Sequence, residues 1–147
     1  IPLYYNKKAP QSHDYVEMSA SPLYPFGYGL SYTSFDYSDL HLSALMPRSF
    51  EISFKVRNTG KYDGEEVAQL YLRDEYASVV QPLKQLKHFA RLFLKCGEEQ
   101  EVKFILSEED FSLVDRNLKK IVEPGTFQIM IGAASNDIRL QTKVEIK

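Results

Sequence analysis

The chain has 147 residues, a formal net charge of −2, 44% hydrophobic residues and 13% aromatic residues. That content suits one packed domain, with or without an extension, and argues against disorder. Charges of both signs are mixed along the chain, so we expect neither nucleic acid nor a membrane as a partner. No apolar run approaches the roughly 18 residues of a membrane-spanning helix. The single cysteine, Cys96, excludes an internal disulfide and a cysteine-rich metal site.

The chain begins at Ile1 rather than at methionine, so we expect its true N-terminus to be missing. Residues 1–21 show weak periodicity. Residues 22–35, PLYPFGYGLSYTSF, combine five Tyr or Phe rings with two prolines and two glycines. Proline fixes φ and glycine opens positive φ, so neither a helix nor a central strand is expected, yet the rings favour burial. We predict a stiff connector whose rings form an interdomain clamp: Pro22, Tyr24, Pro25, Phe26, Gly27, Tyr28, Gly29 and Tyr32.

From residue 35 onward, apolar and polar residues alternate as they do in half-buried β-strands. The first strand pattern, residues 35–42, contains a slip that predicts a bulge. Residues 50–57 form the clearest strand, and residues 58–64 supply turn chemistry. Residues 67–72 are more continuously apolar, which is typical of a central strand covered on both faces or near a sheet crossing. We expect a loop over residues 75–81, closed by Pro82.

Further strand patterns follow at residues 87–94 and 101–106, joined by a turn that includes Cys96. Ser107 and the acidic residues after it predict a helical turn with Ser107 as its cap. Extended structure is expected again over residues 111–114, with a polar hairpin tip at residues 116–120. The last strand patterns cover residues 127–131 and 138–146.

Short strands at this spacing predict an all-β fold, a two-sheet sandwich of immunoglobulin or fibronectin type III-like topology with about seven strands. We assign residues 35–147 to the sandwich and residues 1–34 to an irregular N-terminal extension. The chain has no tryptophan, so Phe54, Tyr71 and Phe104 are expected to fill the core.

Neither the acidic residues nor the histidines form a pattern that indicates a catalytic or metal site. The acidic pairs Glu65–Glu66, Glu98–Glu99 and Glu108–Glu109 lie beside predicted turns or strand ends, where solvated charge is the ordinary role. The histidines, His13, His41 and His88, share no ligand spacing and are expected at the surface or at a sheet edge. We therefore assign no catalytic residue, no cofactor and no metal ligand.

Several motifs of the chain resemble glycoside hydrolase family 3, the β-glucosidases, β-xylosidases and their relatives. Residues 22–35 resemble the segment that leads from an α/β-sandwich domain of these enzymes into a C-terminal fibronectin type III-like domain. Gln69-Leu70-Tyr71-Leu72 resembles the central strand of that domain, and residues 82–89 resemble its following loop and strand. Residues 123–127 resemble the turn before its penultimate strand, so the resemblance covers nearly the whole chain.

The resemblance implies that residues 1–34 are the remnant of the preceding domain together with the connector. It also implies a non-catalytic accessory domain that packs against the catalytic domains of a retaining glycosidase. The catalytic Asp and Glu of the family lie outside the matching region. The aromatic cluster leaves open an alternative, a carbohydrate-binding module, and a third reading is an unrelated adhesive domain. The compartment stays open, with a periplasmic or secreted parent as one option.

Overall fold

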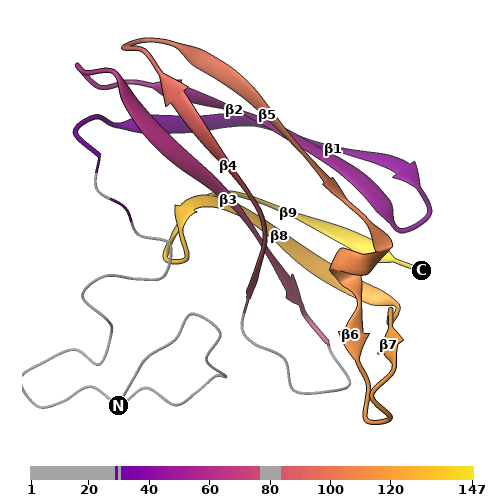
Figure 1. Cartoon of the computed structure of the whole chain (residues 1–147). Helices are drawn as coiled ribbons and strands as arrows, with labels where there is room; N and C mark the ends of the chain where they lie inside the picture. The colour runs from indigo at the N-terminus through magenta and orange to yellow at the C-terminus, as the bar shows by residue number, and fades with distance from the viewer. Residues whose placement is uncertain (1–28, 30, 77–83) are drawn as a thin grey trace, which may run out of the picture.

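Two antiparallel sheets stack face to face in the computed structural model, which describes residues 29, 31–76 and 84–147 (Figure 1). One sheet has the strand order β1-β2-β5 and the other the order β4-β3-β8-β9. These three and four strands confirm the predicted sandwich of about seven strands. Their bounds are Phe35–Met46 (β1), Ser49–Asn58 (β2), Gly64–Asp74 (β3), Gln85–Leu94 (β4), Glu99–Leu106 (β5), Gly125–Ala134 (β8) and Asp137–Ile146 (β9).

A 3-10 turn, η1 (Glu108–Phe111), and a short hairpin of β6 (Leu113–Val114) and β7 (Lys120–Ile121) follow β5. The hairpin projects from the end of the sandwich at which the C-terminus lies (Figure 1). Ser107 is the cap of η1 as predicted, and the Asp110 carboxylate accepts a hydrogen bond of 2.9 Å from its backbone N–H. Extended structure resumes at Leu113 rather than at residue 111, because Phe111 completes the 3-10 turn and is buried.

The core lies between the two sheets and follows the period of two that the sequence shows. Ile52, Phe54 and Val56 of β2 are fully buried there. The rings of Phe54 and Phe104 lie 5.8 Å apart between their centroids, which confirms both as core residues. The other sheet contributes the inward-facing residues Ala68, Leu70, Leu72, Leu92, Leu94, Phe127, Ile129, Ile131, Val144 and Ile146.

Tyr71, the third predicted core residue, is also fully buried but lies on the opposite face of β3. Leu70 and Leu72 on either side of it point into the sandwich, so alternation turns Tyr71 outward. Its hydroxyl donates a hydrogen bond to the side chain of Gln69, and the Lys84 ammonium lies 5.8 Å from the centre of its ring. Strand β3 is therefore covered on both faces, as its continuous apolar pattern predicts.

One irregularity of β1 also agrees with the sequence. Its pairing with β2 shifts between Ser38 and His41, where Asp39 adopts a φ of 55°. This is the bulge that the slip in the alternation predicts. The turn into β2 places Arg48 at a φ of 66°. The loop predicted over residues 75–81 extends beyond the described residues, and among those described no helix is long or apolar enough to cross a membrane.

Candidate functional site

The predicted interdomain clamp falls mostly outside the described part of the chain. Gly29 and Tyr32 are described, whereas the other clamp residues are not: Pro22, Tyr24, Pro25, Phe26, Gly27 and Tyr28. The Tyr32 side chain is 96% exposed. Among the described residues, no atom lies within 4 Å of the position that a Cβ on Gly29 would occupy. These two residues therefore leave their surfaces open on the sandwich side.

The connector is attached to the sandwich by the residues immediately after Tyr32. The Ser34 carbonyl accepts a hydrogen bond of 2.9 Å from the backbone N–H of Thr59 and one of 3.3 Å from the Thr59 hydroxyl. The Thr33 hydroxyl donates a hydrogen bond of 2.7 Å to Oδ1 of Asn58. Three hydrogen bonds thus join the end of the connector to the end of β2.

Asn58 is the centre of this junction and is completely buried. Its Oδ1 also accepts a hydrogen bond of 3.0 Å from the Gly60 N–H. Its Nδ2 donates to the carbonyl oxygens of Tyr62 at 2.7 Å and of Leu94 at 3.0 Å. Two donated and two accepted hydrogen bonds use the full capacity of the carboxamide. One side chain therefore holds the connector, the β2–β3 loop and the end of β4 together.

The β2–β3 loop approaches Thr33 so closely that it requires glycine. A Cβ on Gly60 would lie 1.9 Å from the Thr33 hydroxyl oxygen and 2.7 Å from the Ser34 nitrogen. A Cβ on Gly64 would lie 2.7 Å from Cγ2 of Thr33. The sequence indicates a turn at residues 58–64, but Asn58 carries no signal there that separates a buried hub from an ordinary turn asparagine.

A second contact ties the start of β1 to β9. Arg139 donates hydrogen bonds to both carboxylate oxygens of Asp137, at 2.6 Å and 3.0 Å, and one of 2.9 Å to the Phe35 carbonyl. Its guanidinium also lies over the Tyr37 ring, 5.6 Å from the centroid. The hydrogen bonds from Arg139 lower the pKa of Asp137. The first residues of the sandwich are therefore held from both sheets.

The acidic pairs are exposed or already engaged by neighbours. Glu99 lies 3.7 Å from Lys55, Glu108 lies 2.9 Å from Arg48, and Glu109 forms an ion pair with Lys120. Glu66 is half-buried, and this burial raises the pKa of its carboxyl group. Glu99, Glu108 and Glu109 are therefore surface charges, as predicted, whereas the burial of Glu66 departs from the solvated role predicted for it.

The two described histidines occupy different sheets. His41 is exposed on β1. His88 lies on the edge strand β4, where its Nε2 is 3.2 Å from Oδ2 of Asp110 and its ring stacks on Phe104 at 5.7 Å. Among the described residues no three His, Cys, Asp or Glu side chains gather as a metal-binding group. His13 lies outside the described residues.

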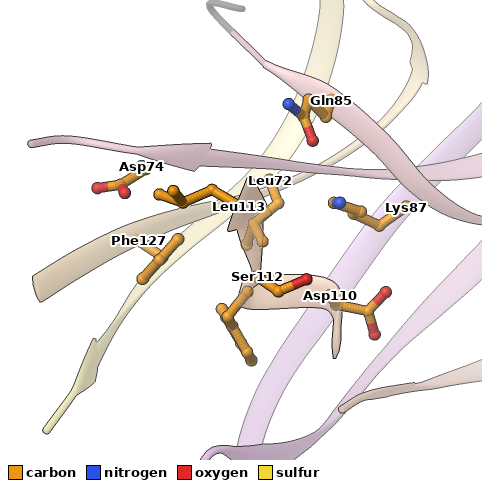
Figure 2. Close-up of a pocket in the computed structure, with 9 residues that line it drawn as sticks. Leu72, Asp74, Gln85, Lys87, Asp110, Ser112, Leu113 and Phe127 are labelled. Carbon is orange, nitrogen blue, oxygen red and sulfur yellow. The ribbon is translucent and has the colours of Figure 1, made fainter. Parts of the chain in front are cut away.

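A small cavity lies beside η1, lined by side chains of the four-stranded sheet, of η1 and of the two residues after it (Figure 2). Asp74 and Lys87 contribute its polar groups, and Leu72 and Phe127 its apolar wall. Its volume is about 30 Å³, which is room for about two water molecules. Pockets that bind small molecules measure about 300–1,000 Å³. This cavity is therefore too small for a sugar ring.

Comparisons with known proteins agree with this geometry. A family model for the fibronectin type III-like domain matches residues 66–135. A β-xylosidase of Formosa agariphila is 47% identical over 125 residues, which cover 83% of this chain and 17% of that protein. A β-glucosidase of Bacteroides ovatus is 44% identical over 129 residues, 85% of this chain and 17% of that protein.

A solved β-glucosidase from Erythrobacter marinus superposes with a TM-score of 0.91 at 39% identity, over 100% of this chain and 20% of that chain. The chain thus spans a fifth or less of these relatives. It belongs to the fibronectin type III-like domains and corresponds to a part of family 3 glycoside hydrolases.

Proposed function

We propose that this chain is a non-catalytic accessory domain that packs against and stabilises the catalytic domains of a larger β-glycosidase. The observation that carries the proposal is the partial match: more than four-fifths of the chain aligns with 17% of a β-xylosidase and 17% of a β-glucosidase. The parent enzyme would hydrolyse β-linked glucosides or xylosides in carbohydrate metabolism. Its two catalytic carboxylates would lie outside this chain.

The junction explains how such a domain could transmit stability. A buried carboxamide with all its hydrogen bonds made holds the last residues of the connector to the β2–β3 loop and to the end of β4. Because leaving a buried polar group unpaired is costly, such a junction resists pulling apart. A rigid junction would favour a single orientation of the preceding domain relative to the sandwich. Residues 1–34 would then be the remnant and connector, and residues 35–147 the accessory domain.

The predicted clamp completes this arrangement. Its rings, on Tyr24, Phe26, Tyr28 and Tyr32, would pack against the preceding domain. The exposure of Tyr32, at 96%, supports this because the ring finds no cover on the sandwich. The other clamp residues, Pro22, Pro25, Gly27 and Gly29, would give the segment its fixed path.

Hydrolysis of aryl β-glucoside and aryl β-xyloside tests the proposal on three proteins: this chain, the full-length parent and the parent truncated before residue 35. We expect turnover only with the catalytic domains present, and a lower thermal midpoint for the truncated parent. Turnover by this chain alone would overturn the proposal, and Glu65→Gln and Glu66→Gln would then be the first variants to examine.

Carbohydrate binding on the aromatic cluster is the second candidate function. The exposed Tyr32 ring favours it, because a free aromatic face can stack on a sugar. Isothermal titration calorimetry of this chain with cello- and xylo-oligosaccharides tests it. Saturable binding that is lost in Tyr24→Ala, Tyr28→Ala or Tyr32→Ala supports a binding module, whereas no heat at millimolar sugar argues against it.

A further inference from the structure

The outer face of the four-stranded sheet carries aromatic side chains that the core does not use. Phe89 and Phe93 on β4 are 67% and 58% exposed. They are four residues apart on one strand, so they share a face at a spacing of about 13 Å. Arg91 lies between them on the same face and is exposed. These three residues are called the β4 stripe.

The strand register places the β4 stripe on the side away from the core. Leu92 and Leu94, its neighbours in β4, are buried in the core. Across the ladder to β3, Phe93 pairs with Glu65, Arg91 with Val67 and Phe89 with Gln69. The two exposed rings therefore offer a partner two apolar contact points on one strand, on either side of Arg91.

The connector enters the sandwich across this same face. Gly29 and Ser31 line a hollow together with Arg91, the middle residue of the β4 stripe, and with Val67, which pairs with Arg91 across the ladder. Gly29 and Ser31, the described connector residues at this hollow, therefore lie beside the middle of the β4 stripe. The opposite sheet, β1-β2-β5, does not line this hollow except through Phe35 at the start of β1.

Arg91 adds a requirement of charge. Among residues 31–76 and 84–147 no carboxylate lies within ion-pair distance of its guanidinium. A partner surface that covers two phenyl rings would also have to pair this cation, since an unpaired buried charge is costly. The complementary surface is thus apolar with at least one Asp or Glu placed between two ring contacts.

We infer that the β4 stripe is the docking surface for the domain that precedes the connector in the same polypeptide. This inference rests on the proposed function and names the surface through which it acts. The relatives are about six times as long as the aligned region, so ample chain exists to cover it. The two rings would fill apolar pockets of that domain, and Arg91 would bind one of its carboxylates.

Hydroxyl-radical footprinting of the full-length enzyme, read by mass spectrometry, tests the inference within one molecule. The protection of each side chain is its oxidation rate in urea divided by its rate in the native enzyme. Phe104, which is 7% exposed, is the buried reference, and Ile105, 56% exposed on β5 of the other sheet, is the exposed reference. We expect protection of Phe89 and Phe93 to equal that of Phe104 and to exceed that of Ile105 at least fivefold. Protection of both rings no greater than that of Ile105 would overturn the inference.

The same experiment separates other occupants. Protection that is lost when the full-length enzyme is diluted to a monomer would assign the β4 stripe to a second copy instead. Protection that requires added oligosaccharide would assign it to a sugar. Either result overturns the inference.

A pair of variants gives an independent readout. In the full-length enzyme, Phe89→Ser with Phe93→Ser should lower the thermal midpoint of the catalytic part, whereas Ile105→Ser should leave it unchanged. If deletion of residues 35–147 destabilises the parent while Phe89 and Phe93 stay unprotected, the surface is wrong and the proposed function stands. If that deletion changes nothing, the proposed function itself fails.

Discussion

The hydroxyl of Thr33 donates a 2.7 Å hydrogen bond to Oδ1 of Asn58, across 25 residues of chain. Thr33 belongs to the end of the connector, and Asn58 is the last residue of β2. The bond links the polypeptide that enters the domain to a fully buried side chain of its scaffold. Movement of the connector at this point therefore requires a buried hydrogen bond to break.

Asn58→Ala should lower the free energy of unfolding by about 2–4 kcal/mol, because its partly buried partners on the connector and the β2–β3 loop and its buried partner on β4 are left unpaired. Urea denaturation followed by far-ultraviolet circular dichroism measures this. Asn136→Ala, at an exposed position of the β8–β9 turn, is the matched control and should change stability by less than about 0.5 kcal/mol. Equal effects of the two substitutions would show that Asn58 is no hub.

Gly60→Ala should destabilise the chain by about 1–3 kcal/mol, since the new methyl group would lie 1.9 Å from the Thr33 hydroxyl oxygen. Gly29→Ala introduces the same methyl group where no atom of the described residues lies within 4 Å, and it should be nearly neutral. Thr33→Ala combined with Gly60→Ala should cost less than the sum of the single substitutions, because the shortest contact, with the Thr33 hydroxyl, disappears while that with the Ser34 nitrogen stays. Strict additivity in thermal denaturation would contradict the contact.

Phe54→Ala should cost about 3–5 kcal/mol, a large share of the stability of a small domain. Phe54 is fully buried, packs on Phe104 and stacks with Tyr37 at 6.0 Å, so its removal opens a cavity that both sheets share. Tyr32→Ala removes an aromatic ring that is 96% exposed and should leave the unfolding midpoint of this chain unchanged. A midpoint in Phe54→Ala as high as in Tyr32→Ala would be inconsistent with this core.

Glu66→Gln should stabilise the chain relative to the wild type, and the gain should be larger at pH 7 than at pH 4. Burial raises the pKa of the Glu66 carboxyl above its ordinary value of 4.5, so the folded chain holds this proton more tightly than the unfolded chain. The stability from this group is complete below pH 4.5 and is lost as the pH rises through the higher folded pKa. Urea midpoints of both proteins from pH 4 to pH 7 check the sign. Glu65→Gln, at an exposed neighbour, should show no such trend.

The sequence by itself determined the fold class and most of the strands. Strict alternation at residues 50–57 corresponds to β2, the slip after residue 37 to the bulge at Asp39, and the cap at Ser107 to η1. These features are local: a period of two, a break in that period and a cap are each encoded within a few residues. The motifs of residues 22–35 and 69–72 were also enough to indicate the family.

Only the tertiary structure decided the site. Asn58 reads as a turn residue, and its role comes from Thr33, Tyr62 and Leu94, which lie on three other segments. Tyr71 and Leu70 are neighbouring hydrophobic residues in the sequence. The packing of the two sheets turns the Tyr71 ring outward and the Leu70 side chain into the core. Which apolar face meets the other sheet depends on contacts between distant strands, and local pattern cannot encode those contacts.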